Sequence, residues 1–89
     1  MNEAEINEIE TRVQKASRTP WKAYIEGRDH ESGSSFIMVG DGDNRQDDIE
    51  LHGATLDDYD FIANARQDVP KLIAEIRRLQ AIIDKAQYS

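Results

Sequence analysis

A proline stands inside the longest helical pattern of this sequence and limits what the last third of the chain can form. Apolar residues recur at helical spacing over 55–87, and Pro70 falls within that range. Proline has no backbone N–H and a fixed φ, so it disfavours a helix interior but suits a first turn. Thr55 and Asp58 can form a capping box at a helix start, and Asp68 can cap a second helix. We therefore predict two helices that meet at a corner ending at Pro70.

The helix predicted after that corner, 69–87, carries a regular apolar stripe. Its members alternate at spacings of four and three: Leu72, Ile76, Leu79, Ile83 and Ala86. Ile73 and Ile82 widen the stripe beyond that of a strict coiled coil. The width favours packing on a sheet and leaves room for a homodimer contact through the C-terminal helix.

The segment 2–17 is predicted to be an amphipathic helix. Asn2 and Glu5 can form a capping box, and apolar residues follow at spacings of three, four and three: Ile6, Ile9, Val13 and Ala16. Acidic residues come early and basic residues late, which complements the helix dipole. Pro20 ends the pattern. The stripe is narrow, so the helix must lean on the rest of the domain or on another chain.

Three strands are predicted between the helices. Trp21–Arg28 alternates apolar and polar residues, and Ser35–Gly40 is apolar on both faces, as a central strand would be. Asp48–His52 is the third strand. The order α-β-β-β-α-α predicts an α+β domain: a three-stranded antiparallel sheet with helices packed on one face. Residues 1–89 are expected to form a single domain.

The charge balance narrows the class of partner. Eighteen acidic residues against eleven basic ones give a net charge of −7. Phosphates and anionic lipids repel such a chain, so neither direct nucleic-acid binding nor membrane docking is expected. No apolar run approaches the roughly 20 residues that cross a bilayer, and the acidic start is unlike a signal peptide. We expect a soluble, cytoplasmic protein whose acidity confers solubility or meets a basic partner.

The acidic residues concentrate in one stretch of sequence. Eight of them are candidates for binding a partner: Asp41, Asp43, Asp47, Asp48, Glu50, Asp57, Asp58 and Asp60. They do not match an EF-hand loop, because the positions that need a ligand or glycine after Asp41 hold Arg45, Gln46 and His52. A looser Ca²⁺ or Mg²⁺ site stays open, although no metal or other cofactor is predicted.

Catalytic chemistry is not expected. The carboxylates lie in stretches typical of exposed turns, whereas acid–base work needs a buried group with a raised pKa. There is no cysteine to act as a nucleophile or zinc ligand. His30 and His52 belong to no metal or hydrolase motif. The chain is therefore predicted not to be an enzyme, and Arg66 is expected to hold the corner through the Asp68 carboxylate or a carbonyl.

The run Phe61-Ile62-Ala63-Asn64-Ala65-Arg66-Gln67-Asp68-Val69-Pro70 and the Leu/Glu-containing helix after it resemble a C-terminal segment of many small phage and prophage proteins. Those proteins carry an Asp-Ala-like pair before the phenylalanine, where this chain has Asp58-Tyr59-Asp60. The resemblance implies an origin and no particular activity. In architecture alone, an acidic α-β-β-β-α-α domain is also similar to certain type II anti-CRISPR proteins.

Charge, acidic stretch and resemblance together predict an inhibitor encoded by a phage or mobile element. Its carboxylates would take the place of DNA phosphates on the basic surface of a host nucleic-acid enzyme, such as a Cas or restriction nuclease. One alternative is a structural or adaptor module that self-associates through its long helices. Another is a sponge for a nucleotide signal, for which the candidate cations are Arg66, Lys22 and Arg45.

Overall fold

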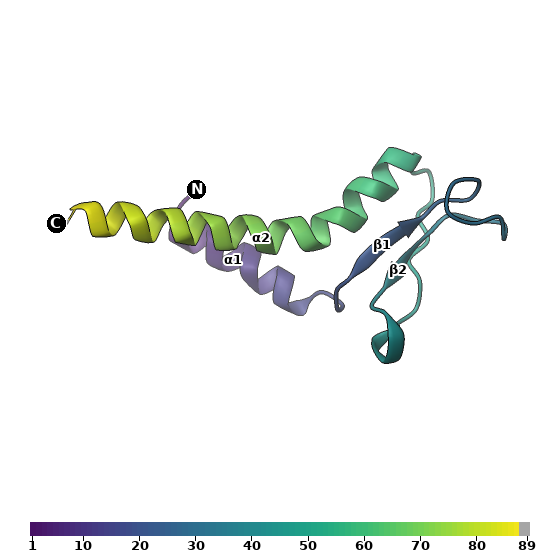
Figure 1. Ribbon diagram of the computed structural model, residues 1–89, viewed down its shortest axis with the longest axis horizontal. Helices are drawn as coiled ribbons and strands as arrows, with labels where there is room; N and C mark the ends of the chain where they lie inside the picture. Colours follow the sequence, from purple (N-terminus) through teal and green to yellow (C-terminus); the bar gives the residue numbers. More distant parts are fainter. Residues whose placement is uncertain (88–89) are drawn as a thin grey trace.

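The computed structural model describes residues 1–87 and confirms an α+β fold, in an elongated form. The elements are α1 (Glu3–Lys15), β1 (Trp21–Tyr24), β2 (Phe36–Val39), the short 3-10 turn η1 (Gly42–Asn44) and α2 (Leu56–Gln87). Figure 1 shows α2 running most of the length of the molecule, with the two strands beside its first part and α1 along its middle. The radius of gyration is 17.0 Å, against about 12 Å for a compact chain of this length.

The predicted pair of helices is wrong, because residues 56–87 form one continuous helix with Pro70 inside it. The predicted start is confirmed: Thr55 N donates to Asp58 Oδ2 (2.9 Å) and Asp58 N donates to Thr55 Oγ1 (3.1 Å). Pro70 removes one intrahelical hydrogen bond and its ring crowds the carbonyl four residues earlier. α2 bends in the stretch before the proline and does not break (Figure 1). Ala63 before the proline and Ile73 after it are both buried, so packing anchors α2 on each side of Pro70.

The predicted third strand is also wrong. β1 and β2 pair antiparallel, with Trp21 opposite Val39, but in the segment 48–52 only Ile49 joins them. It exchanges two backbone bonds with Ile37, of 2.8 and 2.9 Å, as an isolated bridge. The backbone N–H of Leu51 donates to the hydroxyl of Tyr59 in α2 (3.0 Å). The ladder ends there because the backbone N–H and C=O of Leu51 bond to the Tyr59 hydroxyl of α2 and not to β2.

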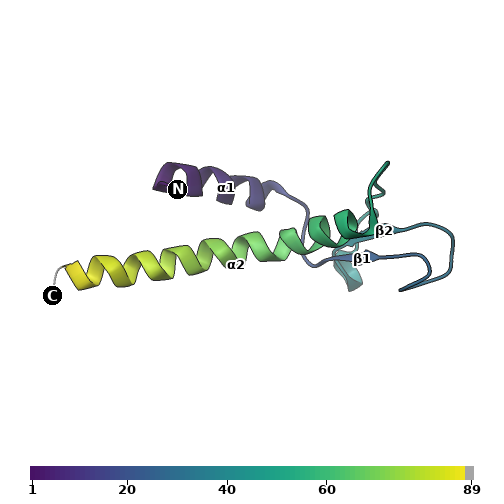
Figure 2. The same cartoon turned by 90° about the horizontal axis from the view of Figure 1, so that it is seen from above.

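The core lies between the sheet and the first half of α2 (Figure 2). Its buried members come from three elements and the segment after β1: Ala23, Ile25, Ile37, Val39, Tyr59 and Ala63. Gln67 adds a polar clamp, since Trp21 N donates to its Oε1 (2.7 Å) while its Nε2 donates to Trp21 O (3.1 Å). α2 therefore holds β1 through both apolar packing and backbone hydrogen bonds.

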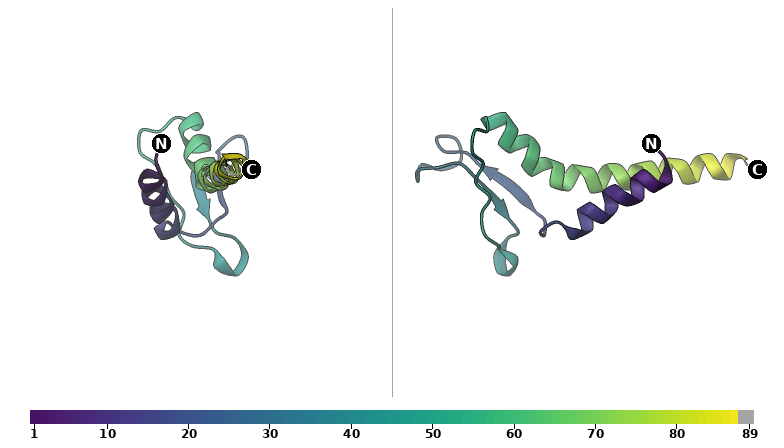
Figure 3. Two further views of the ribbon diagram at one scale, coloured as in Figure 1. Left: turned by 90° about the vertical axis from the view of Figure 1, so that its left-hand side faces the viewer. Right: turned by 180° about the vertical axis from the view of Figure 1, so that it is seen from behind.

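α1 packs along the middle of α2 and forms a second, smaller contact region (Figure 3). The predicted capping box of Asn2 and Glu5 is present, and Ile6 is only 1% exposed. Arg77 of α2 donates to three side chains along α1: Glu3, Asn7 and Glu10. The apolar stripe of 69–87 was expected to pack on the sheet, whereas its buried residue, Ile73, lies beside α1.

Candidate interaction surfaces

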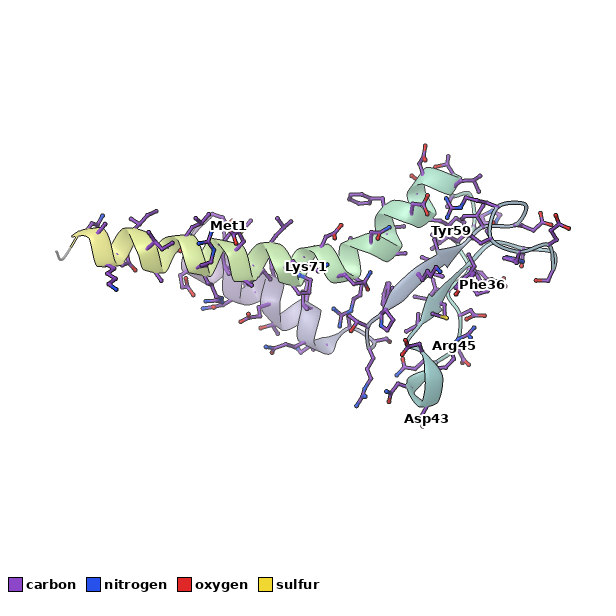
Figure 4. The ribbon with its side chains drawn as sticks, viewed as in Figure 1. Met1, Phe36, Asp43, Arg45, Tyr59 and Lys71 are labelled. Atoms are coloured by element: carbon purple, nitrogen blue, oxygen red, sulfur yellow. The ribbon has the colours of Figure 1, made fainter. Side chains whose placement is uncertain are left out.

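The eight predicted partner-binding carboxylates are distributed over two sides of the sheet. Figure 4 labels Asp43 and Arg45 at η1, on one side, and Tyr59 in the first turns of α2, on the other. Asp41 belongs to the η1 turn as its N-terminal flanking residue. The remaining candidates lie on the connecting chain or at the helix start: Asp47, Asp48, Glu50, Asp57, Asp58 and Asp60. The continuous acidic stretch of the sequence is thus divided in space.

Three of these carboxylates have structural partners within the chain. Asp58 caps α2, as described above, and Asp48 accepts a hydrogen bond from Arg45 (2.7 Å). Asp60 accepts two, from Nη1 and Nη2 of Arg28 (2.8 and 3.0 Å). A bidentate pair of this kind fixes both side chains in one orientation. These three residues stabilise the turns that they connect.

Arg28 forms a small charge cluster with Asp60 and Asp29. Asp29 accepts from the backbone N–H of Ile25 (2.8 Å) and from Arg28 Nε (3.1 Å). These two bonds lower the pKa of Asp29, the one from Ile25 most strongly, and the bonds from Arg28 lower the pKa of Asp60. Asp60 first and Asp29 second raise the pKa of Arg28. Local spacing gave no signal for the cluster, because Arg28 and Asp60 are 32 residues apart.

The other five carboxylates remain free for a partner. Their side chains are exposed, and none makes a hydrogen bond or ion pair to residues 1–87: Asp41, Asp43, Asp47, Glu50 and Asp57. Within the same range, no group of three metal-binding side chains lies close enough together to hold an ion. These carboxylates therefore form no defined site; their negative charge is spread over the segment 41–50 and the start of α2.

The three cations considered for a nucleotide each interact with a different neighbour. Arg66 Nε donates to the carbonyl of Ser17 (2.9 Å), so the predicted carbonyl contact is confirmed, although it joins α2 to the segment after α1. Lys22 lies 4.9 Å from the centre of the Tyr24 ring, and Arg45 pairs with Asp48. The observed contacts do not converge on one anion.

Several large apolar side chains are exposed on the distal half of α2. Four of them form what we call the distal face: Leu72, Ile76, Leu79 and Ile83. They are 37–60% exposed, and every residue from 78 to 87 is exposed. Next to this face lies a groove of about 250 Å³ between the two helices, lined only by apolar residues: Met1, Ile6, Ile9, Val69, Leu72, Ile73 and Ile76. Figure 4 shows Met1 beside this part of α2.

No protein-family model, curated protein or solved structure matches the chain. Among the helices formed by residues 1–87, none combines the length and the apolar character needed to cross a membrane. Two surfaces of the molecule are available for contact with a partner: the divided carboxylates and the distal face.

Proposed function

We propose that the protein is a non-enzymatic structural or adaptor module that self-associates through the distal face of α2. The exposure of four large aliphatic side chains on one helical face supports this proposal. Full burial of a Leu or Ile side chain is worth roughly 1.5–3 kcal/mol. A contiguous exposed apolar surface of this kind is typical of an interface.

The length of the unsupported helix also favours a partner. Residues 78–87 extend past Arg77, whose side chain donates hydrogen bonds to α1. Most helical stability in proteins comes from tertiary packing of an apolar face, and every residue from 78 to 87 is exposed. A partner that covers Leu79 and Ile83 would therefore stabilise both the interface and the helix itself.

Mass in solution tests the proposal. We expect the wild-type chain to sediment above its monomer mass of 10.2 kDa, and a Leu79→Gln/Ile83→Gln variant to sediment as a monomer. The matched control is Ala74→Gln/Ala81→Gln, which adds the same two amides to exposed positions on another side of α2. A wild-type monomer at all concentrations, or equal masses for both variants, contradicts self-association through this face.

A second candidate is an inhibitor that binds a basic surface of a host Cas or restriction nuclease, in keeping with a phage or mobile-element origin. The net charge of −7 and the five free carboxylates favour it. Complementary charge accelerates association and makes binding sensitive to salt. The division of the carboxylates over two sides of the sheet requires a partner that reaches around η1 or contacts only part of the set.

Pull-down of such nucleases at low and high salt tests this second candidate. A variant with Asp43→Asn, Asp47→Asn and Glu50→Gln should lose the salt-sensitive partner. The control, Glu8→Gln, Glu31→Gln and Asp84→Asn, removes the same charge at exposed positions elsewhere and should retain it. Absence of any salt-sensitive nuclease partner, or equal loss in both variants, rules out the inhibitor.

A further inference from the structure

We infer that α2 pairs with α2 of a second copy of this chain as a parallel, in-register, two-stranded coiled coil. The inference rests on the self-association proposed above and adds the identity, number and direction of the partner helices. Its evidence is a heptad pattern that becomes continuous only because α2 is one helix.

An unbroken 3-4 repeat runs along one face of α2 for 25 residues. In heptad notation the a positions are Ile62, Val69, Ile76 and Ile83, and the d positions are Ala65, Leu72, Leu79 and Ala86. Every member is apolar. A corner at Pro70 would have cut this repeat in two, which is why the sequence pattern alone showed only its second half.

Pro70 does not interrupt the seam, because it lies on another side of the helix. It lines a groove together with Val13 and Gln14 of α1 and with Ile73 of α2. In the heptad it takes a b position, about 100° around the helix from the a positions. The side of α2 that carries Pro70, Ile73 and Arg77 packs against α1. The first a and d residues border this contact, since Ala65 and Val69 are half-buried beside α1, whereas Leu79 and Ile83 lie beyond α1 and are exposed.

The residue types at a and d identify the partner helix. All four a positions hold β-branched residues, and the two central d positions hold leucine. β-Branched residues at a with Leu at d favour two parallel strands over trimers and tetramers. The seam contains no charged or polar residue that another class of partner would have to match. A second identical helix satisfies it at every layer.

The flanking residues are compatible with the parallel register. In a parallel pair each g position faces the e position five residues later on the other chain, which puts Asp68 near Ile73 and Glu75 near Gln80 of the second copy. No like charges meet. The antiparallel register that covers the whole seam instead brings the two Glu75 side chains together at the symmetry axis, where like charges repel.

The parallel arrangement has a consequence for the rest of the molecule. α1 of each copy flanks the seam, with Met1 and Ile9 in the apolar groove beside Leu72 and Ile76. The middle of the dimer then contains four helices, α1 and α2 of each copy, whereas its C-terminal end contains only the two α2 helices. Because the sheet lies at one end of α2 (Figure 1), both sheets and their free carboxylates would lie at the same end of the parallel dimer.

Disulfide cross-linking tests the direction, since the chain has no cysteine. Leu72→Cys and Ala86→Cys introduce single thiols at two d positions, 14 residues or about 21 Å apart along the helix. In a parallel, in-register pair each variant should form a disulfide-linked dimer with itself under mild oxidation, because facing d positions meet the distance requirement. Ala81→Cys, on the opposite side of the helix, is the control and should stay reduced.

The outcomes separate this inference from the proposal beneath it. Self-linking of both d-position variants, with a dimer mass by sedimentation equilibrium, supports the parallel pair. A dimer in which Ala86→Cys links to Ile62→Cys, the position that faces it in the antiparallel register, while neither variant links to itself, overturns the direction and leaves self-association standing. A trimer or tetramer overturns the two-stranded seam. A monomer at all concentrations overturns both.

Discussion

The hydroxyl of Tyr59 joins three segments of chain at one point. It accepts a hydrogen bond from Leu51 N (3.0 Å), and its single proton is shared between the carbonyls of Leu51 (3.2 Å) and Ser35 (3.3 Å). The residue is 6% exposed, so water cannot easily replace these bonds. Tyr59 thus links α2 to the segment 48–52, which does not form a strand.

Tyr59→Phe should therefore destabilise the fold although it keeps the ring. It leaves the partly buried N–H of Leu51 without a partner, which costs about 1–3 kcal/mol. Urea denaturation measures the loss, and Tyr24→Phe, whose hydroxyl has no bond in residues 1–87, is the matched control. Equal stabilities of the two variants would contradict the role given to Tyr59.

The Arg28 cluster should make stability depend on acid pH. The pKa values of Asp29 and Asp60 are lower in the folded chain than their ordinary value, so both groups bind protons more weakly when folded. Their contribution is fully present above the ordinary carboxyl pKa of about 4 and is lost as the pH falls below it.

In Arg28→Gln, the midpoint of unfolding should fall less steeply than in the wild type as the pH is lowered from about 5 to about 2. Arg12→Gln, which removes the same charge at an exposed position of α1, is the control and should retain the wild-type slope. An unchanged slope in Arg28→Gln would show that the bonds from Arg28 do not couple protonation of Asp60 to folding.

At the scale of whole elements, the features set by residues close in sequence could be predicted, whereas those set by tertiary contacts could not. Both capping boxes and the position of β2 followed from residues close in sequence. The continuity of the helix through Pro70 depends on packing at Ala63 and Ile73. Whether segment 48–52 forms a strand depends on its bonds to Tyr59. No local pattern contains those contacts. The apolar stripe of 69–87 was visible in the sequence, but it was predicted to pack on the sheet; its exposure and its continuity through Pro70 are known only from the structure.

The attachment of α1 offers a test at this scale. Arg77 is the residue of α2 that donates to three side chains of α1, at 2.8, 3.1 and 3.2 Å. Exposed ion pairs contribute up to about 1 kcal/mol each. Arg77→Met should therefore lower the free energy that holds α1 against α2 by a comparable amount. Hydrogen exchange should accelerate in α1 and not in β1.

The control for this change is Arg78→Met, because Arg78 pairs within α2, with Glu75. It removes an arginine next in sequence without touching α1. If both variants accelerate exchange in α1 equally, the bonds from Arg77 are not what holds the helix in place.

For the whole molecule, the proposed self-association predicts that stability depends on protein concentration. A chain that buries its distal face only in a dimer gains folding free energy by mass action. The thermal midpoint should rise with protein concentration in the wild type, whereas Leu79→Gln/Ile83→Gln should show one midpoint throughout. Differential scanning calorimetry over a hundredfold concentration range measures this. A constant wild-type midpoint would contradict a dimer that is linked to folding.

The clamp from Gln67 restricts how this protein can meet other chains. The backbone N–H and C=O of Trp21 point away from β2 and are both occupied by the amide of Gln67. Further along the same edge, the N–H of Ile25 is occupied by Asp29. An extended peptide that tried to add itself as a new strand would find these ladder positions filled. These occupied positions oppose edge-to-edge polymerisation along β1.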